Sequence, residues 1–206
     1  MSKKTPQNLQ KVLEVFSKEP RNVPLEVFHK NPYKTLVSTI MSSRTKDETT
    51  LDASKRLFKK APNIKKLDQL GELEIRDLIY PVGFYKTKAK HLKKLTKALI
   101  VKFDSKVPVT RSNLVSLPGV GRKTANLILN RAFGKPAIAV DTHVHRISNL
   151  IGWVNTKNPD QTEEKLMEII PKKYWGEINT LFVSVGRNHN SKKKLEEFLK
   201  SKQLLK

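Results

Sequence analysis

The feature that most constrains the fold is the helical spacing of apolar residues along nearly the whole chain. Apolar side chains recur three or four residues apart, for example at Ile178, Leu181, Phe182 and Val185, as on one face of an α-helix. Convincing alternation of apolar and polar residues, which marks a β-strand, is not found. The sequence of 206 residues therefore predicts an all-α fold with one sizeable core or two small ones.

Several helix boundaries can be predicted from capping residues. Asn31-Pro32 and Asn158-Pro159 each combine a capping side chain with a proline in the first helical turn. A further helix is expected over residues 86–103, with a lysine-rich outer face. Its predicted inward residues are Ala89, Leu92, Leu95 and Leu99.

Charge and cysteine content narrow the function classes. The chain has 41 Lys and Arg against 19 Asp and Glu, a formal net charge of +22, which favours a polyanionic partner. Its longest apolar runs are far shorter than the roughly 20 residues of a membrane span, and the N-terminus lacks the apolar core of a signal peptide. We therefore expect a cytoplasmic protein that binds nucleic acid rather than a membrane. The absence of cysteine excludes disulfides, thiol catalysis and cysteine-bound metal.

The segment LPGVGRKTANLILNRAFG, residues 117–134, joins two predicted helices by a glycine hairpin. Its spacing rules out a P-loop, which needs four residues between the glycines and a lysine directly after the second. Gly119 and Gly121 can expose backbone N–H groups, and Arg122 adds positive charge, so the hairpin suits a DNA phosphate. The alternative is an ordinary turn between two helices.

Four segments together resemble one enzyme family. LPGVGRKTANLIL followed by AIAVDTHVHRISN is similar to the helix-hairpin-helix and aspartate segment of the endonuclease III family of DNA glycosylase/lyases. STIMSSRTKDETT (residues 38–50) and YPVGFYKTKA (residues 80–89) lie where that family has related segments. The resemblance extends from about the first helix to Gly186-Arg187, and Arg44 is typical of the archaeal branch.

The resemblance assigns Lys123 as the catalytic lysine and Asp141 as the catalytic aspartate. A lysine amine can attack the sugar and form a Schiff base, which permits β-elimination of the 3′ phosphate. A nearby carboxylate can stabilise the oxocarbenium-like transition state. From the residues alone, Lys123 could equally contact a phosphate and Asp141 could simply cap a helix.

The resemblance also implies a set of DNA-binding residues. Arg44 would face the orphaned base once a nucleotide is rotated out, and Phe84 would act as a wedge between bases. The alternative for Phe84 is an ordinary core residue. The other expected DNA-binding residues are Gly119, Gly121, Arg122 and Thr124.

No catalytic metal is expected. His143 and His145 are two residues apart and face different sides of a helix, so they are interpreted as core or supporting residues. Many relatives bind a [4Fe–4S] cluster through four cysteines, but Asn190 stands where the first would be. The basic tail, residues 192–206, could replace the cluster as a packed helix or bind DNA loosely. The resemblance leaves room for a monovalent cation at the hairpin.

The resemblance implies two helical lobes with a DNA-binding cleft between them. Residues 24–135 would form a barrel-like lobe that contains the helix-hairpin-helix at about 110–133, and residues 1–23 with 136–206 would form the second. We expect a monomeric, nucleoid-associated prokaryotic enzyme that binds double-stranded DNA with a damaged base or an abasic site. It would remove oxidised pyrimidines and cleave the abasic site. The alternatives are a glycosylase for oxidised purines or mismatched bases, and a non-catalytic DNA-binding protein.

Overall fold

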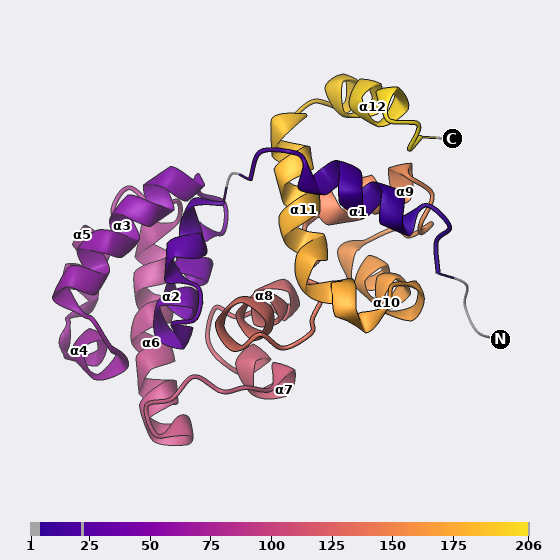
Figure 1. The fold of residues 1–206 in the computed structure, drawn as a ribbon. Helices are drawn as coiled ribbons and strands as arrows, with labels where there is room; N and C mark the ends of the chain where they lie inside the picture. The colour runs from indigo at the N-terminus through magenta and orange to yellow at the C-terminus, as the bar shows by residue number, and fades with distance from the viewer. Residues whose placement is uncertain (1–4, 22, 206) are drawn as a thin grey trace. The chain divides into compact units, whose positions relative to one another are not determined.

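The computed structural model describes residues 5–21 and 23–205, and every regular element in these residues is a helix (Figure 1). No described residue lies in a β-strand, so the predicted all-α fold is confirmed. Among the described helices, none has both the length and the apolar character needed to cross a bilayer. The chain divides into two compact units. The hairpin unit comprises residues 24–135, and the terminal unit comprises residues 136–205 with the described residues up to 23.

The hairpin unit is built around the long helix α6. Its elements are η1 (Pro24–Phe28), α2 (Pro32–Ser42), α3 (Asp47–Lys60), α4 (Ile64–Gln69), α5 (Glu72–Ile79), α6 (Tyr85–Phe103), α7 (Arg111–Val115) and α8 (Arg122–Phe133). Helices α2, α4 and α5 pack against α6, while α3 packs against α2 and α5. On its other side α2 packs against α8, which also contacts α7. Near its C-terminal end, Met41 of α2 accepts a bond from Lys88 in the first turn of α6, and Ile40 lies beside Gly119, which precedes α8.

The terminal unit is centred on α11. Its elements are α1 (Leu9–Ser17), α9 (Thr142–Leu150), α10 (Pro159–Ile169), η2 (Lys172–Tyr174), α11 (Trp175–Asn188) and α12 (Lys192–Ser201). Helix α1 lies against α11, although the two are far apart in sequence (Figure 1). Phe16 meets the ring of Phe182 edge to face at 5.0 Å, and Trp153 Nε1 donates to Asn8 Oδ1 at 2.8 Å. Aromatic contacts therefore join the two ends of the chain in one core.

The predicted caps are confirmed. Asn31 Oδ1 accepts from Lys34 N and Asn158 Oδ1 accepts from Gln161 N, both at 3.0 Å. Helix α6 begins at Tyr85, one residue before the predicted start. Its predicted inward residues, Ala89, Leu92, Leu95 and Leu99, are all buried.

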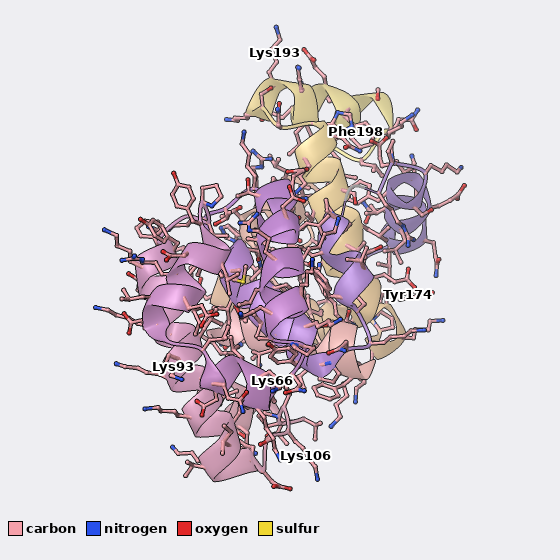
Figure 2. The ribbon with its side chains drawn as sticks, turned by 90° about the vertical axis from the view of Figure 1, so that its left-hand side faces the viewer. Lys66, Lys93, Lys106, Tyr174, Lys193 and Phe198 are labelled. Carbon is pink, nitrogen blue, oxygen red and sulfur yellow. The ribbon has the colours of Figure 1, made fainter. Side chains whose placement is uncertain are left out.

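The first part of the basic tail is a packed helix. Leu195, Phe198 and Leu199 of α12 are buried in the core of the terminal unit, and the His189 ring stacks on Phe198 with centroids 4.0 Å apart. Lys193 points outward from the same helix, on the side opposite Phe198 (Figure 2). Of the two alternatives for the tail, the structure shows the packed helix over residues 192–201.

Candidate active site and DNA interface

The hairpin between α7 and α8 is a tight turn anchored by apolar residues. Thr110 Oγ1 caps α7 by accepting from Asn113 N at 3.4 Å. Leu117 and Val120 are buried on either side of the turn, and Val120 N donates to Leu117 O at 3.1 Å. Buried side chains and a backbone hydrogen bond therefore fix the conformation of the turn and the positions of its glycines.

The two hairpin glycines have different structural roles. Gly119 has φ +80°, and a Cβ built there would lie 3.3 Å from His91 Nδ1, so the position favours glycine for both conformation and space. Gly121 has φ −93° and ψ 177°, an extended conformation that any residue adopts. A Cβ at Gly121 would meet no atom within 4 Å. Of the two hairpin glycines, Gly119 alone has a positive φ.

The first turn of α8 forms an electropositive surface. Gly121 is its N-cap and supplies no capping side chain, and this turn, which the structure describes in full, has no acidic residue. Arg122 and Thr124 are half-buried there, while Lys123 is exposed. A pocket of about 330 Å³ lined by Arg111, Ser112, Val115 and Arg122 lies beside it. Backbone N–H groups at a helix start together with two arginines suit a phosphate group.

Asp141 is the N-cap of α9, as one alternative predicted. Its Oδ1 accepts from His143 N and from Val144 N, both at 2.9 Å. The preceding segment, residues 137–140, is buried and is tied to α11 by Asn179 Nδ2, which donates to Ala139 O at 2.8 Å. Both capping bonds end on Oδ1, so the cap orients the carboxylate without using its second oxygen. Lys123 belongs to the hairpin unit and Asp141 to the terminal unit.

Arg44 and Phe84 lie together on the hairpin unit. Arg44 stands between α2 and α3 with φ +53°, and Phe84 is the N-cap of α6 with φ +57°. The Arg44 guanidinium carbon lies 5.5 Å from the centre of the Phe84 ring. Phe84 is 60% exposed, so it is not a core residue. With Gly119, both residues line a pocket of about 370 Å³.

Lys88 lines the same pocket and was missed by sequence reasoning. It is only 6% exposed, and burial lowers the pKa of its ammonium group to about 8. Its Nζ donates to Met41 O at 2.7 Å, to Ser43 O at 2.5 Å and to Thr45 Oγ1 at 3.2 Å. A signal was present, because Lys88 stands four residues before Leu92 on the apolar stripe of α6.

The two histidines after Asp141 have structural contacts. A Cβ at Gly186 would collide with the ring of His143, so α11 can pack here only because this residue is glycine. His145 Nδ1 is 2.6 Å from Thr162 Oγ1. Within the described residues, no group of three or more His, Cys, Asp or Glu side chains is arranged to hold a metal ion.

The residues present do not fit an iron–sulfur cluster. Such clusters are held by cysteine thiolates, and the chain contains no cysteine. After Gly186 the chain continues through Asn190 into α12, whose apolar side chains complete the core of the terminal unit. An amphipathic helix with a buried apolar face thus follows Asn190.

Comparisons with known proteins agree with this fold and site. Residues 37–172 match the family described as HhH-GPD superfamily base excision DNA repair protein. Endonuclease III of Thermotoga maritima is 44% identical over 176 residues, covering 84% of this chain and 80% of that protein. Endonuclease III-like protein 1 of Bos taurus is 40% identical over 158 residues, covering 75% of this chain and 52% of that protein.

Solved structures show the same likeness. The structure of a trapped endonuclease III–DNA covalent intermediate is similar with a TM-score of 0.81 and 35% identity, covering 89% of this chain and 84% of that chain. A thermostable thymine-DNA glycosylase, with a TM-score of 0.78 but 23% identity, shows the shared fold alone. The chain therefore belongs to the HhH-GPD superfamily of base excision DNA repair proteins, as an endonuclease III-type glycosylase without cluster cysteines. The family resemblance predicted from the sequence is confirmed.

Proposed function

We propose that the protein binds double-stranded DNA, removes oxidised pyrimidines through Lys123 and cleaves the resulting abasic site by β-elimination. The observation that carries this proposal is the exposed lysine in the first turn of α8, directly after the glycine hairpin, in a chain of endonuclease III type. One of the similar solved structures is a trapped covalent intermediate between endonuclease III and DNA, which supports a nucleophilic mechanism.

In the proposed reaction the neutral amine of Lys123 attacks C1′ of the damaged nucleotide. The glycosidic bond breaks, and the base leaves with its bonding electrons and takes up a proton. Asp141, oriented by its cap on α9, stabilises positive charge on the sugar in the transition state. The attached nitrogen then loses a proton, and its lone pair forms a double bond to C1′ as the C1′–O4′ bond breaks. O4′ takes up a proton to become a hydroxyl, and the lysine is left as an iminium ion.

Strand cleavage follows from the acidity that the iminium gives to C2′. Loss of a C2′ proton drives departure of the 3′ phosphate from C3′, which leaves an unsaturated iminium on the lysine. Water hydrolyses this linkage and regenerates the amine. The sequence of steps uses one amine, one carboxylate and water from the solvent.

DNA would be held by contacts that carry no sequence information. The amides at the start of α8, from Gly121 to Thr124, and the side chain of Arg122 would bind phosphate oxygens, with Gly119 allowing the close approach of the turn. Arg44 and Phe84 would enter the duplex where the damaged nucleotide leaves it.

Borohydride trapping tests the chemistry. Reduction of the iminium forms a stable secondary amine, so the wild-type protein should crosslink to a duplex with an abasic site. Lys123→Ala should lose the crosslink and strand cleavage yet retain binding to undamaged duplex, since other cations hold the phosphates. Absence of a wild-type crosslink would refute the lyase activity, and a crosslink in Lys123→Ala would assign the nucleophile to another amine.

The substrate is tested separately with duplexes that each carry one lesion. Oxidised pyrimidines should be released faster than oxidised purines or mismatched bases. Asp141→Asn should slow base release while binding stays largely unchanged, as expected for a group that acts in the transition state. Preferential release of an oxidised purine would reject the proposed substrate class without affecting the trapping result.

A further inference from the structure

We propose that Lys88 is a positioning residue that joins two surface turns into one rigid probe for entering the duplex. The two turns are the Arg44 turn (residues 43–46) and the Phe84 turn (residues 80–84), and Lys88 lies beneath both. The task assigned to the probe, pushing the damaged nucleotide out of the stack, rests on the proposed function. The mechanical coupling itself rests on contacts inside the hairpin unit.

The first step is that the three N–H donors of the Lys88 ammonium group find three acceptors. A lysine ammonium has three N–H donors, and Nζ is bonded to three oxygens, from Met41, Ser43 and Thr45. Met41 and Ser43 lie at the C-terminal end of α2, where helix carbonyls lack partners within the helix and attract positive charge. The charged amine is thereby fixed at the base of the Arg44 turn.

The second step is the hydroxyl of Thr45, which extends this bonding to the Phe84 turn. Thr45 Oγ1 accepts from Lys88 Nζ at 3.2 Å and from Gly83 N at 3.1 Å. It also lies 3.2 Å from Ser43 O as a donor. One hydroxyl thus bonds to Lys88 and to both turns, whereas a lysine that only capped α2 would not require the bond to Thr45.

The third step is that the two turns touch along their backbones. A Cβ at Gly83 would lie 2.6 Å from Arg44 O, so a residue with any side chain would force the turns apart. Arg44 and Phe84 both adopt left-handed φ values, +53° and +57°, which non-glycine residues keep only where the surroundings enforce them. This backbone geometry presents the guanidinium and the ring side by side, 5.5 Å apart, with Phe84 exposed.

The coupling can be measured without catalysis by the fluorescence of 2-aminopurine. The probe duplex carries 2-aminopurine opposite tetrahydrofuran, a stable abasic analogue, and all proteins carry Lys123→Ala so that no chemistry occurs. Entry of Arg44 and Phe84 should unstack the 2-aminopurine and raise its emission. Lys88→Met, which keeps length but removes the donors, should reduce this rise about fivefold or more, within the range expected for a coupled hydrogen-bond network.

Matched controls separate coupling from charge and from folding. Lys90→Met removes an exposed lysine two residues along the same helix and should leave the fluorescence rise unchanged. Thr45→Val should reproduce most of the Lys88→Met loss, whereas Thr45→Ser, which retains the hydroxyl, should restore the wild-type signal. Combining Lys88→Met with Thr45→Val should add little, because both remove the same connection. If Lys88→Met failed to fold, the Thr45 pair would decide the question.

Turnover gives an independent readout on proteins that retain Lys123. Lys88→Met should lower kcat for a lesion in a fully paired duplex and leave KM nearly constant. The defect should shrink when the lesion lies in a mismatch, where extrusion costs less. An unchanged fluorescence rise in both Lys88→Met and Thr45→Val would overturn the proposal while the crosslink result still supported the chemistry. No rise in the Lys123→Ala reference would also overturn it, because the probe would not enter DNA.

Discussion

Two turns of the hairpin unit, before α6 and before α8, have similar local sequences but differ in the side chains that they expose. Pro81 and Pro118 each precede the first helical residue by four positions, in the segments that begin α6 and α8. The second helical residue is a lysine in both, Lys86 and Lys123, and the third is a threonine. Shared turn chemistry therefore sets where each helix begins and leaves its function open.

The difference arises at the N-cap and at the fourth helical position. At the N-cap, α6 has Phe84 in a left-handed conformation with its ring exposed, whereas α8 has Gly121 with no side chain. At the fourth helical position, α6 buries Lys88 and α8 buries Ala125. The turn before α6 therefore projects the Phe84 ring above the buried Lys88. The turn before α8 has no side chain at its N-cap, and such a helix start suits an anion. Different residues at these two positions thus separate a turn with an exposed aromatic side chain from a helix start without a capping side chain.

The largest expected difference lies at the second helical position. Lys123→Ala should reduce crosslinking and strand cleavage at an abasic site by about 10³-fold or more, because it removes the nucleophile. Lys86→Ala changes the same position and charge in α6 and should keep both activities within about threefold. Borohydride trapping and gel-resolved cleavage measure the pair. Equal losses in the two variants would mean that these lysines act only as phosphate contacts.

The glycines of the two turns should differ next in their effect on stability. Gly83→Ala places a methyl group against the Arg44 carbonyl and should lower the free energy of unfolding by about 1–3 kcal/mol. Gly121→Ala meets open space and should change it by less than about 0.5 kcal/mol. Urea denaturation measures both variants. A neutral Gly83→Ala would show that the two turns can separate at little cost.

The buried lysine at the fourth position should make stability depend on pH. Burial lowers the pKa of Lys88 from 10.5 to about 8, so between these values the unfolded chain binds a proton that the folded chain has released. The free energy of unfolding should therefore rise with pH across this window, by at most about 1.4 kcal/mol per pH unit. Lys88→Met should lose this rise.

Denaturation series of the two proteins from pH 7.5 to 10.5 provide the measurement for Lys88. Arg44 and His91 are the other titratable groups that line the pocket. Both remain in the variant, so their contributions should cancel in the difference. Parallel curves for wild type and Lys88→Met would contradict the lowered pKa.

The smallest expected effect concerns the first helical position. Arg122→Ala should weaken binding to undamaged duplex and make the negative salt slope, d log K/d log [salt], shallower by about one unit, the value for one lost phosphate contact. Tyr85→Ala, at the same position of α6, should leave the slope unchanged. Anisotropy titrations at several salt concentrations would show whether phosphate is bound at the start of α8 and not at the start of α6.

The parts of the fold that depend on residues close together in the sequence could be predicted from the sequence. The caps at Asn31 and Asn158, the inward face of α6 and the hairpin before α8 follow from short-range spacing, and the structure shows each of them. Residue patterns also placed Asp141 at the start of a helix. The roles of Lys123 and Asp141 came from family resemblance, and these roles stay predictions.

Features that depend on distant partners were not predicted. Lys88 is buried only because α2 ends in carbonyls that face it, 47 residues away in the case of Met41. Arg44 and Phe84 have left-handed conformations in two turns that touch, and neither residue type signals this. For residues 192–206 the charge pattern allowed either a packed helix or a tail that binds DNA loosely. The burial of Leu195, Phe198 and Leu199 in the core shows the packed helix.

The hairpin unit is inserted in sequence between the two parts of the terminal unit, and this order affects folding during synthesis at the ribosome. All of the hairpin unit lies in one continuous stretch, so it can fold soon after residue 135 emerges. The terminal unit takes α1 from the start of the chain and α11 and α12 from its end, and partners such as Gln10 and Tyr174 lie 164 residues apart. Helix α1 therefore leaves the exit tunnel well before α11, and its apolar face stays uncovered until α11 has emerged. During that interval Phe16 and Leu9 are surfaces that chaperones or a neighbouring nascent chain can reach.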